Sequence, residues 1–382
     1  MNSLTSDPMR ILLLADAQSS HTYKWASSLK ERGTDVAVFC LSRPEDYDYR
    51  ELGIPVYCPF PFGKTVYRAS VLRKAQFVRV VPALKKTLRE FAPGILHAHY
   101  ASSYGLLGAL SGFHPYLVSV WGYDVFEFPE KSFLARAILR YNLRKADGVF
   151  STSHIMAEQT RSYTRHPVKV VPFGIDTGIF RKEKENRRSP GDPLVIGTIK
   201  TLEPKYGIVY LVRAFDLLRR NYPELPLRLL IVGGGSQEKE LRKLSDDLGI
   251  GNRVTITGRV PYREIPPYYR KLDIYAALSV ASESFGVAVL EASATGIPVV
   301  VSDRGGLPEV VEDGVTGFVV PAENSEKAAE ALEKLVRSED LRNRMGAAGR
   351  SRVQNLFEWS ACVDKMMEIY HGYEDHADHP VL

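Results

Sequence analysis

Short aliphatic runs alternate with longer stretches of helical pattern along this 382-residue chain, and this alternation restricts the fold most. In the first half, we predict strands at Ile11–Ala15, Val36–Leu41, Ile95–His99, Leu117–Val120, Val149–Ser151 and Val168–Val171. Helices are predicted at Thr22–Arg32, closed by Gly33, and at Ala101–Leu110. Strands that alternate with helices are typical of parallel, doubly wound sheets, so the predicted fold class is α/β.

The same alternation restarts after a charged stretch rich in proline and glycine, residues 181–193, which has the composition of a linker. Further strands are predicted at Leu194–Thr198, Leu227–Val232, Val254–Thr257, Ile274–Ala277 and Val299–Ser302. We therefore expect two Rossmann-like domains, 1–175 and 176–355, that face each other across a cleft. Residues 356–382 are expected to form a helix, about Trp359 to Tyr370, that packs on the first domain, followed by a mobile tail. Ligands of such sheets bind beyond the carboxyl ends of the strands.

The most informative segment runs from Ser282 to Ser302 and reads SESFGVAVLEASATGIPVVVS. A helix is predicted to begin near Phe285 and to end at Gly296, before Pro298. At its start, the amide groups of Phe285, Gly286 and Val287 are expected to point outward and to attract phosphate. Glu283 lies just before the helix. Glu291 lies two turns into it, where a carboxylate suits vicinal ribose hydroxyls.

These residues closely resemble the motif of glycosyltransferase family 4, two glutamates separated by seven residues with Phe-Gly between them. The downstream runs Gly305–Glu309 and Gly314–Val319 also fit this family. The resemblance implies the GT-B fold and a retaining transferase that needs no metal. It implies that Glu283 holds hydroxyls of the transferred sugar and that Glu291 holds the ribose of a nucleotide donor.

Two lysines, Lys200 and Lys205, match the family's phosphate-binding positions after the strand at Leu194–Thr198. The family often has arginine at the first position, and lysine keeps the charge but loses the bidentate geometry. Arg259 and Val260 follow another strand and match a loop beside the nucleotide base, although a purely structural turn is an equal alternative. Fixed positive charge at the departing diphosphate is expected to lower the barrier to sugar transfer most.

The first half matches the family less closely. Ser20 and His21, at the start of the first helix, are candidates for acceptor contact, and capping of that helix by Ser19 or Ser20 is the alternative. His97 and His99 end one strand, and Trp121 and Asp124 follow the next. The family carries a functional histidine near one of these places. We predict His99 for that catalytic contact with the sugar, and Trp121 and Asp124 for the acceptor side.

Neither a metal nor another cofactor is expected. Asp46-Tyr47-Asp48 has the spacing of a metal-binding pair, but it lies in an acidic loop away from the lysines. A nucleotide-sugar epimerase, a phosphorylase, a dinucleotide-binding oxidoreductase and a non-catalytic scaffold are the alternatives. The oxidoreductase is disfavoured because no glycine-rich fingerprint follows the first strand. We expect a UDP-sugar as donor and a saccharide, glycolipid or small molecule as acceptor, in the synthesis of an envelope glycan, and no nucleic-acid partner.

Localisation is expected to be cytoplasmic, because the amino terminus lacks the features of a secretory signal and the three cysteines are far apart in sequence. Between Glu51 and Glu90 the chain has no acidic residue but eight basic ones, from Lys64 to Arg89. Apolar residues interleave with them, and Pro82 is expected to break the helical pattern. A segment of this kind suits an anionic membrane surface, a phosphorylated acceptor or a solvated helix.

Overall fold

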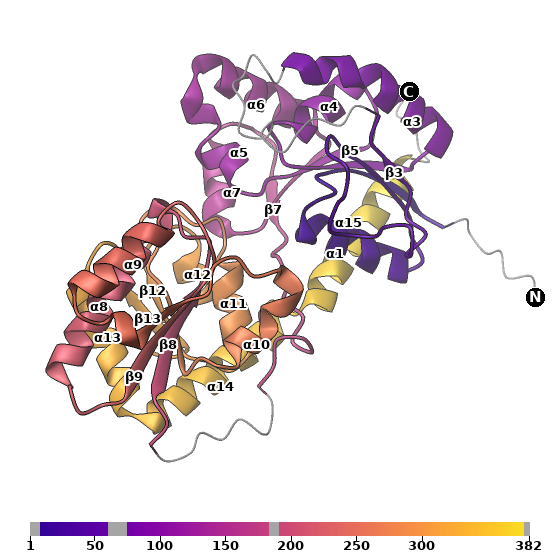
Figure 1. The fold of residues 1–382 in the computed structure, drawn as a ribbon. Helices are drawn as coiled ribbons and strands as arrows, with labels where there is room; N and C mark the ends of the chain where they lie inside the picture. The colour runs from indigo at the N-terminus through magenta and orange to yellow at the C-terminus, as the bar shows by residue number, and fades with distance from the viewer. Residues whose placement is uncertain (1–7, 60–74, 183–190, 378–382) are drawn as a thin grey trace, which may run out of the picture. The chain divides into compact units, whose positions relative to one another are not determined.

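The computed structural model describes residues 8–59, 75–182 and 191–377 (Figure 1). The chain divides into two compact units. Unit 1 comprises Met1–Pro172 and Ser360–Leu382, and unit 2 comprises Phe173–Trp359. The expected boundaries, after residues 175 and 355, lie within a few residues of these. The strongly basic residues Lys64, Arg68, Arg73 and Lys74 lie outside the described part of the chain.

Unit 1 is built on a seven-stranded parallel sheet with the order β3-β2-β1-β4-β5-β6-β7. Its strands are β1 (Arg10–Leu14), β2 (Asp35–Phe39), β3 (Val56–Tyr57), β4 (Ile95–His99), β5 (Tyr116–Ser119), β6 (Gly148–Ser151) and β7 (Val168–Val170). Its helices are α1 (Ser20–Glu31), η2 (Ala75–Val80), α3 (Val81–Phe91), α4 (Tyr104–Ser111), α5 (Tyr123–Phe126), η3 (Pro129–Lys131), α6 (Phe133–Lys145), α7 (His154–Arg161) and α15 (Trp359–Ala377). The order reverses between β1 and β4, where an open sheet of this type binds ligands.

Unit 2 repeats this design with a six-stranded parallel sheet of order β10-β9-β8-β11-β12-β13. Its strands are β8 (Leu194–Ile199), β9 (Leu227–Val232), β10 (Val254–Ile256), β11 (Ile274–Ala277), β12 (Val299–Ser302) and β13 (Gly317–Val320). Its helices are η4 (Pro204–Tyr206), α8 (Ile208–Asn221), α9 (Glu238–Asp247), η5 (Gly251–Arg253), η6 (Tyr262–Glu264), α10 (Pro266–Tyr269), α11 (Val287–Ala294), α12 (Leu307–Val310), α13 (Ser325–Arg337) and α14 (Glu339–Leu356). Here the order reverses between β8 and β11.

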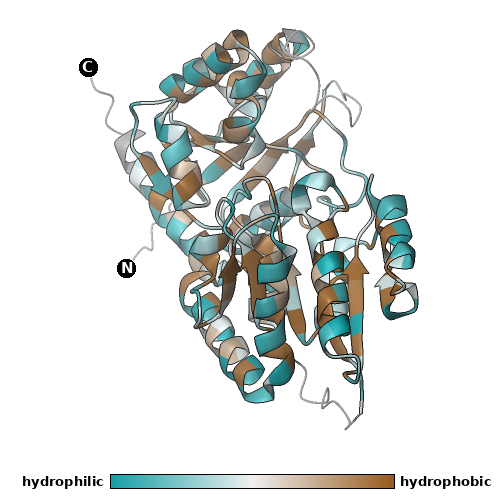
Figure 2. Cartoon of the chain, turned by 90° about the vertical axis from the view of Figure 1, so that its left-hand side faces the viewer, coloured by the Kyte–Doolittle hydropathy of each residue, from teal (hydrophilic) through white to brown (hydrophobic). Residues whose placement is uncertain are grey.

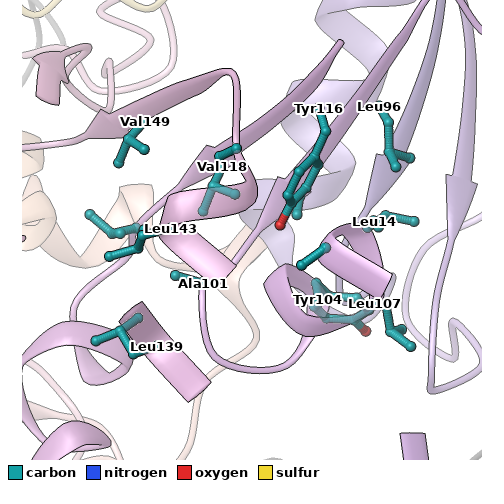
Figure 3. Close-up of a cluster of buried hydrophobic side chains, with 14 of the residues drawn as sticks. Leu14, Leu96, Ala101, Tyr104, Leu107, Tyr116, Val118, Leu139, Leu143 and Val149 are labelled. Atoms are coloured by element: carbon teal, nitrogen blue, oxygen red, sulfur yellow. The ribbon is translucent and has the colours of Figure 1, made fainter. Parts of the chain in front are cut away.

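Both sheets are buried on two faces, so their strands are nearly continuous apolar runs, which appear brown in Figure 2. In unit 1, alternate residues of β1, β4 and β5 point toward α4 and α6. Figure 3 shows this cluster, where Leu14, Leu96 and Val118 lie near Leu107, Leu139 and Leu143. Because side chains alternate along a strand, His97 and His99 of β4 point to the opposite face.

Several expectations about the ends of elements were wrong. Pro82 occupies the first turn of α3, where a missing amide costs nothing, so it starts a helix instead of breaking one. The tail is also more ordered than expected, because α15 continues through Ala377.

Cys40 and Cys58 lie far apart in sequence but close together in space. They follow the neighbouring strands β2 and β3, and their thiols share a hydrogen bond.

Helix α15 completes unit 1 although it follows unit 2 in sequence. Arg32 of α1 forms an ion pair with Asp364, with Nε 2.6 Å from Oδ1. The Tyr370 hydroxyl lies 2.6 Å from Nδ1 of His97, and Lys365 donates to the carbonyl of Val170. These contacts place the terminal helix on the sheet face opposite α4 and α6.

Candidate functional site

The reversal of strand order in unit 2 brings Lys200 and Glu283 together. Lys200 directly follows β8, and Glu283 lies in the loop between β11 and α11. Lys200 Nζ is 2.8 Å from Glu283 Oε1, and Ser279 donates a hydrogen bond of 2.7 Å to the same oxygen. The two charged side chains are 20% and 11% exposed, so their pairing takes place largely out of water.

The charges of this pair stabilise each other. Burial raises the pKa of Glu283, but the charge of Lys200, the hydrogen bonds from Lys200 and Ser279 and the charge of Lys205 together hold that pKa below its ordinary value. Burial lowers the pKa of Lys200, but the charge of Glu283, its hydrogen bond to Lys200 and the nearby Tyr275 and Tyr206 together bring that pKa above its ordinary value. Both groups are therefore ionised near neutral pH.

Lys205 extends the positive charge at this edge of the sheet. It lies in η4, is exposed, and places its ammonium group 5.3 Å from the centre of the Tyr206 ring. The ammonium group of Lys200 lies 4.4 Å from the same centre. The backbone of this turn is fixed, because the Lys205 carbonyl accepts hydrogen bonds from the amides of Val280 and Ala281. The two lysines thus share one aromatic platform that the sequence interpretation did not single out.

The start of α11 lies beside the lysine–glutamate pair. Gly286 precedes the first residue, Val287, with a φ of 103° that disfavours other residues. Phe285 is buried with its ring edge against Phe357 and anchors the turn. The helix runs from Val287 to Ala294, so it starts two residues later than predicted, and Thr295 rather than Gly296 occupies its C-cap.

Glycines let neighbouring loops approach this turn closely. A Cβ atom on Gly305 would overlap the backbone of Glu283, and one on Gly306 would lie 2.9 Å from the Cα of Phe285. The amide of Gly306 donates a hydrogen bond of 2.8 Å to the Glu283 carbonyl. The Gly305-Gly306 pair therefore holds Glu283 in place, which gives the downstream glycine run a physical function.

Arg259 and Val260 lie in the loop after β10, beside the glycine loop that follows β9. Gly233 and Gly258 form an isolated antiparallel bridge, and a Cβ atom on Gly234 would be 3.1 Å from the Arg259 amide. The side chain of Arg259 is exposed and that of Val260 is half-buried. The loops after β8, β9 and β10 thus lie next to one another.

Glu291 is buried and held by two tyrosines. Tyr262 and Tyr269 each donate a hydrogen bond of 2.8 Å, to Oε1 and Oε2 respectively. No sequence pattern connected these tyrosines with Glu291, because they lie 29 and 22 residues before it. A carboxylate oxygen can accept more than one hydrogen bond, and binding of a ribose at Glu291 remains a prediction.

The corresponding edge of unit 1 holds a neutral cluster of aromatic rings. His99 is buried, with its ring centre 4.9 Å from that of Trp121 and 4.6 Å from that of His97. Burial first, and the charge of His21 second, lower the pKa of His99 to about 3. Among the described residues, its Nδ1 has no hydrogen-bond partner.

His21 and Ser20 lie at the start of α1. The His21 ring contacts Trp121 at 5.9 Å between centres, and burial with the charge of Lys24 lowers its pKa to about 4. Ser19 occupies the N-cap but makes no capping hydrogen bond through its side chain. Ser20 instead forms a side-chain hydrogen bond with Tyr47.

Asp124 differs from the acceptor contact that the sequence analysis expected. Its carboxylate is completely buried and accepts hydrogen bonds from the amides of Ala101, Trp121 and Gly122, at 2.7, 3.1 and 2.8 Å. Burial raises its pKa despite these three hydrogen bonds. We therefore assign Asp124 a structural function, in which it orders the loop that carries Trp121.

Asp46 and Asp48 are exposed, and Asp48 accepts a hydrogen bond from the amide of Arg50. Throughout the described ranges, no three histidine, cysteine or acidic side chains are grouped as a metal site would require. In the same ranges, no helix combines the length and apolarity that a bilayer span requires.

Family models match both units. One for glycosyl transferases group 1 matches residues 179–352, and one described as glycosyl transferase 4-like matches residues 10–153. The chain belongs to the family 4, group 1 glycosyltransferases. This family assignment agrees with the resemblance found in the sequence. The first match includes Lys200 and Glu283, and the second includes His99 and Trp121.

Curated relatives of this family member are similar over part of their length. A GDP-mannose-dependent alpha-(1-6)-phosphatidylinositol monomannoside mannosyltransferase of Mycobacterium tuberculosis is 31% identical over 63% of this chain and 65% of the relative. A D-inositol 3-phosphate glycosyltransferase of Corynebacterium jeikeium is 35% identical over 53% of this chain and 51% of the relative. The chain thus matches less than two thirds of the length of either relative.

Solved structures support the fold over nearly the whole chain. The sucrose-phosphate synthase of Thermosynechococcus elongatus has a TM-score of 0.80 at 21% identity, covering 95% of this chain and 98% of that one. HepE of Anabaena, solved with UDP and glucose, has a TM-score of 0.76 at 20% identity, covering 95% of this chain and all of that one. Two Rossmann-like α/β units of this kind constitute the GT-B fold.

Proposed function

We propose that this chain transfers a sugar from a nucleotide diphosphate to a hydroxyl acceptor. The observation that carries the proposal is the Lys200–Glu283 pair, which lies beside Lys205 and the start of α11 where the strand order reverses. Sugar transfer from a diphosphate requires fixed positive charge at the leaving group and acceptors for the sugar hydroxyls. This edge of unit 2 offers both within one short span of structure.

The leaving diphosphate would be held by Lys200, Lys205 and the amides at the start of α11. Positive charge that is fixed before reaction stabilises the departing phosphate without reorganisation. Binding of the donor would bring a phosphate to Lys200, whose ammonium group has three protons to donate. Glu283 would then accept hydroxyls of the sugar while it stays close to Lys200.

The other donor contacts follow from the loops beside this pair. Glu291 would accept the ribose hydroxyls, and Arg259 and Val260 would contact the base. For the base, we propose uridine, as expected from the sequence. The name of the mycobacterial relative contains GDP-mannose, so guanosine is the alternative base that the experiment below includes. We propose retention of anomeric configuration, independence of metal and an envelope saccharide or glycolipid as acceptor. A catalytic contact of His99 with the transferred sugar remains a prediction.

The first experiment measures thermal stabilisation of the full chain by a panel of UDP- and GDP-sugars, followed by transfer assays with the sugar that stabilises it. Lys205→Ala should lower the transfer rate by about 100- to 1,000-fold, the usual cost of one electrostatic contact to a transition state. Glu283→Gln should lower it similarly. Lys271→Ala removes another exposed lysine of unit 2, which lies over the Tyr268 ring, and should leave transfer unchanged.

Unchanged transfer in both Lys205→Ala and Glu283→Gln would refute the proposed site. Nuclear magnetic resonance of the product then tests the proposed retention, because an inverted anomeric centre would exclude it. Activity measured with and without a chelator tests the independence of metal, and a strict manganese requirement would exclude that part.

A further inference from the structure

A basic groove of about 800 Å³ lies in unit 1, away from both the Lys200–Glu283 pair and the ring cluster around His99. Helix α6 forms one wall, and the end of α7 with the turn after it forms the other. Its positive charge comes from Arg136, Arg140, Arg144, Arg161 and Arg165. None of the described residues that line the groove is acidic.

Repulsion between neighbouring arginines destabilises α6, which carries three of them. Arg136, Arg140 and Arg144 follow one another at intervals of four residues, which places like charges side by side along one face of α6. Glu130 neutralises one end, with Oε1 3.1 Å from the Arg136 guanidinium. Arg140, Arg144 and Arg165 are exposed and form no ion pair with a described residue. Such a charge excess suits a ligand with several negative charges.

Two large apolar side chains stand exposed at the start of α6. Phe133 is 85% exposed and Leu134 is 53% exposed, and Phe133 also lines the groove. Ser132 accepts a hydrogen bond of 3.1 Å from the amide of Ala135, which fixes the first turn and therefore the direction of both side chains. A soluble ligand with many charges gives no reason for this exposed apolar pair, whereas a lipid surface does.

We propose that the basic groove binds phosphate headgroups of an anionic membrane surface, while Phe133 and Leu134 enter its interfacial layer. Guanidinium groups pair with phosphate oxygens in a bidentate manner, and neighbouring arginines bind several headgroups together. The inference goes beyond the proposed transfer reaction and does not depend on it, because vesicle binding needs neither donor nor acceptor.

The alternative basic surface is α3, within the segment for which the sequence analysis left membrane contact open. Its exposed Lys85, Lys86 and Arg89 carry a similar charge, but Lys86 pairs with Glu90. The apolar side of α3 is already used, because Leu84 and Leu88 are buried in the core of unit 1. In the described part of that segment, Val78 of η2 is the one large apolar side chain that is mostly exposed, at 51%, whereas α6 begins with two, which favours α6.

The test measures partition of the full chain onto vesicles of phosphatidylglycerol mixed with phosphatidylcholine and onto vesicles of phosphatidylcholine alone. One basic residue near an anionic surface contributes roughly fivefold to binding, so R140A/R144A/R165A should lower the partition coefficient by roughly 100-fold. F133S/L134S keeps the charge and should lower it by a similar factor, about 100-fold, since each large apolar side chain that leaves water contributes about tenfold or more. K85A/K86A/R89A removes the same charge from α3 and should leave partition within about threefold of the wild type.

Equal partition of the wild type onto both vesicle types would overturn the proposal, as would a loss in K85A/K86A/R89A as large as that in R140A/R144A/R165A. Tight binding of soluble polyphosphate without binding of either vesicle would assign the groove to a soluble polyanion instead, and would also overturn it. Melting curves of each variant accompany the measurement. Substitutions at exposed arginines should leave melting nearly unchanged, so lost partition then reports the surface itself.

Discussion

The two units put chemically different groups at the same place in the same architecture. In unit 2, the reversal between β8 and β11 holds Lys200 against Glu283, with opposite charges 2.8 Å apart. In unit 1, the reversal between β1 and β4 holds His99 within a neutral ring cluster whose other members are His97 and Trp121. The fold therefore determines where a site forms, and the loop residues determine its charge.

The difference extends to how each edge is built. In unit 2, backbones approach one another directly, because Gly305 and Gly306 lie against Glu283 and Phe285. In unit 1, a buried side chain holds the loop, because Asp124 accepts three backbone amides. Unit 2 should therefore be sensitive to an added methyl group near its site, and unit 1 to a change of protonation in its buried cluster.

The largest expected effect tests the close approach in unit 2. Gly305 has a φ of 58°, and a Cβ atom there would overlap the Glu283 backbone. Gly305→Ala should lower the free energy of unfolding of unit 2 by about 4 kcal/mol, the sum of a left-handed alanine and an overpacked contact. It should also reduce transfer, since Glu283 must move.

Gly112 in unit 1 is the matched control for this substitution. Its φ is 70°, and nothing lies within 4 Å of the Cβ position. Gly112→Ala should cost only about 1 kcal/mol, from the backbone alone. Urea unfolding, with hydrogen exchange to assign the loss to a unit, measures both. Equal costs at the two glycines would remove the distinction between the edges.

A second prediction concerns the charge pair. Lys200→Met leaves Glu283 partly buried without its main partner, and should destabilise unit 2 by about 3 kcal/mol at pH 7. The double variant Lys200→Met/Glu283→Gln removes both charges and should recover most of that loss. Ser279 still has an acceptor in the glutamine amide oxygen. Additive losses in the double-mutant cycle would mean that the two charges do not interact.

Much of the fold could be predicted because its periodicity is strong. Ile95–His99, Leu227–Val232, Ile274–Ala277 and Val299–Ser302 were predicted with the bounds that the structure shows. The short strand Val56–Tyr57 was missed, since two half-buried residues carry no periodicity. Helix ends were less accurate: the helix predicted from Ala101 begins at Tyr104, and the one predicted to end near Tyr370 continues to Ala377, because helix ends carry weaker sequence signals than helix interiors.

The charges of the candidate site could be predicted from the sequence, but their partners could not. Glu283 and Lys200 each belong to a local motif, whereas their ion pair depends on the order of β8 and β11 in the sheet. Tyr262 and Tyr269 donate hydrogen bonds to Glu291 from other helices, and their spacing in the sequence does not predict these contacts. For Asp124, the sequence shows that a carboxylate is present but not that three amides enclose it.

The smallest expected effect tests whether the unit 1 cluster is neutral. The pKa of His99 is about 3 in the folded chain, against about 6.5 in the unfolded chain. Below pH 6.5 the unfolded state therefore binds a proton that the folded state does not. Stability is complete above pH 6.5 and falls as the pH decreases toward 3. His99 alone should lower the free energy of unfolding of unit 1 by about 2 kcal/mol between pH 8 and pH 5.

His99→Gln should remove that share of the decline while leaving the shares of His97 and His21, whose pKa values burial also lowers. His154→Gln, at an exposed histidine of α7, controls for a general effect of losing an imidazole. Urea unfolding at pH 8, 6.5 and 5 measures the three proteins. If His99→Gln and the wild type lose the same stability between pH 8 and pH 5, His99 takes up a proton over this range in the folded chain, as it does in the unfolded chain. At pH 5, the sheet edge of unit 1 that holds His99 would then be charged, like the sheet edge of unit 2 that holds Lys200 and Glu283. The two edges would differ only in how the backbone holds these residues.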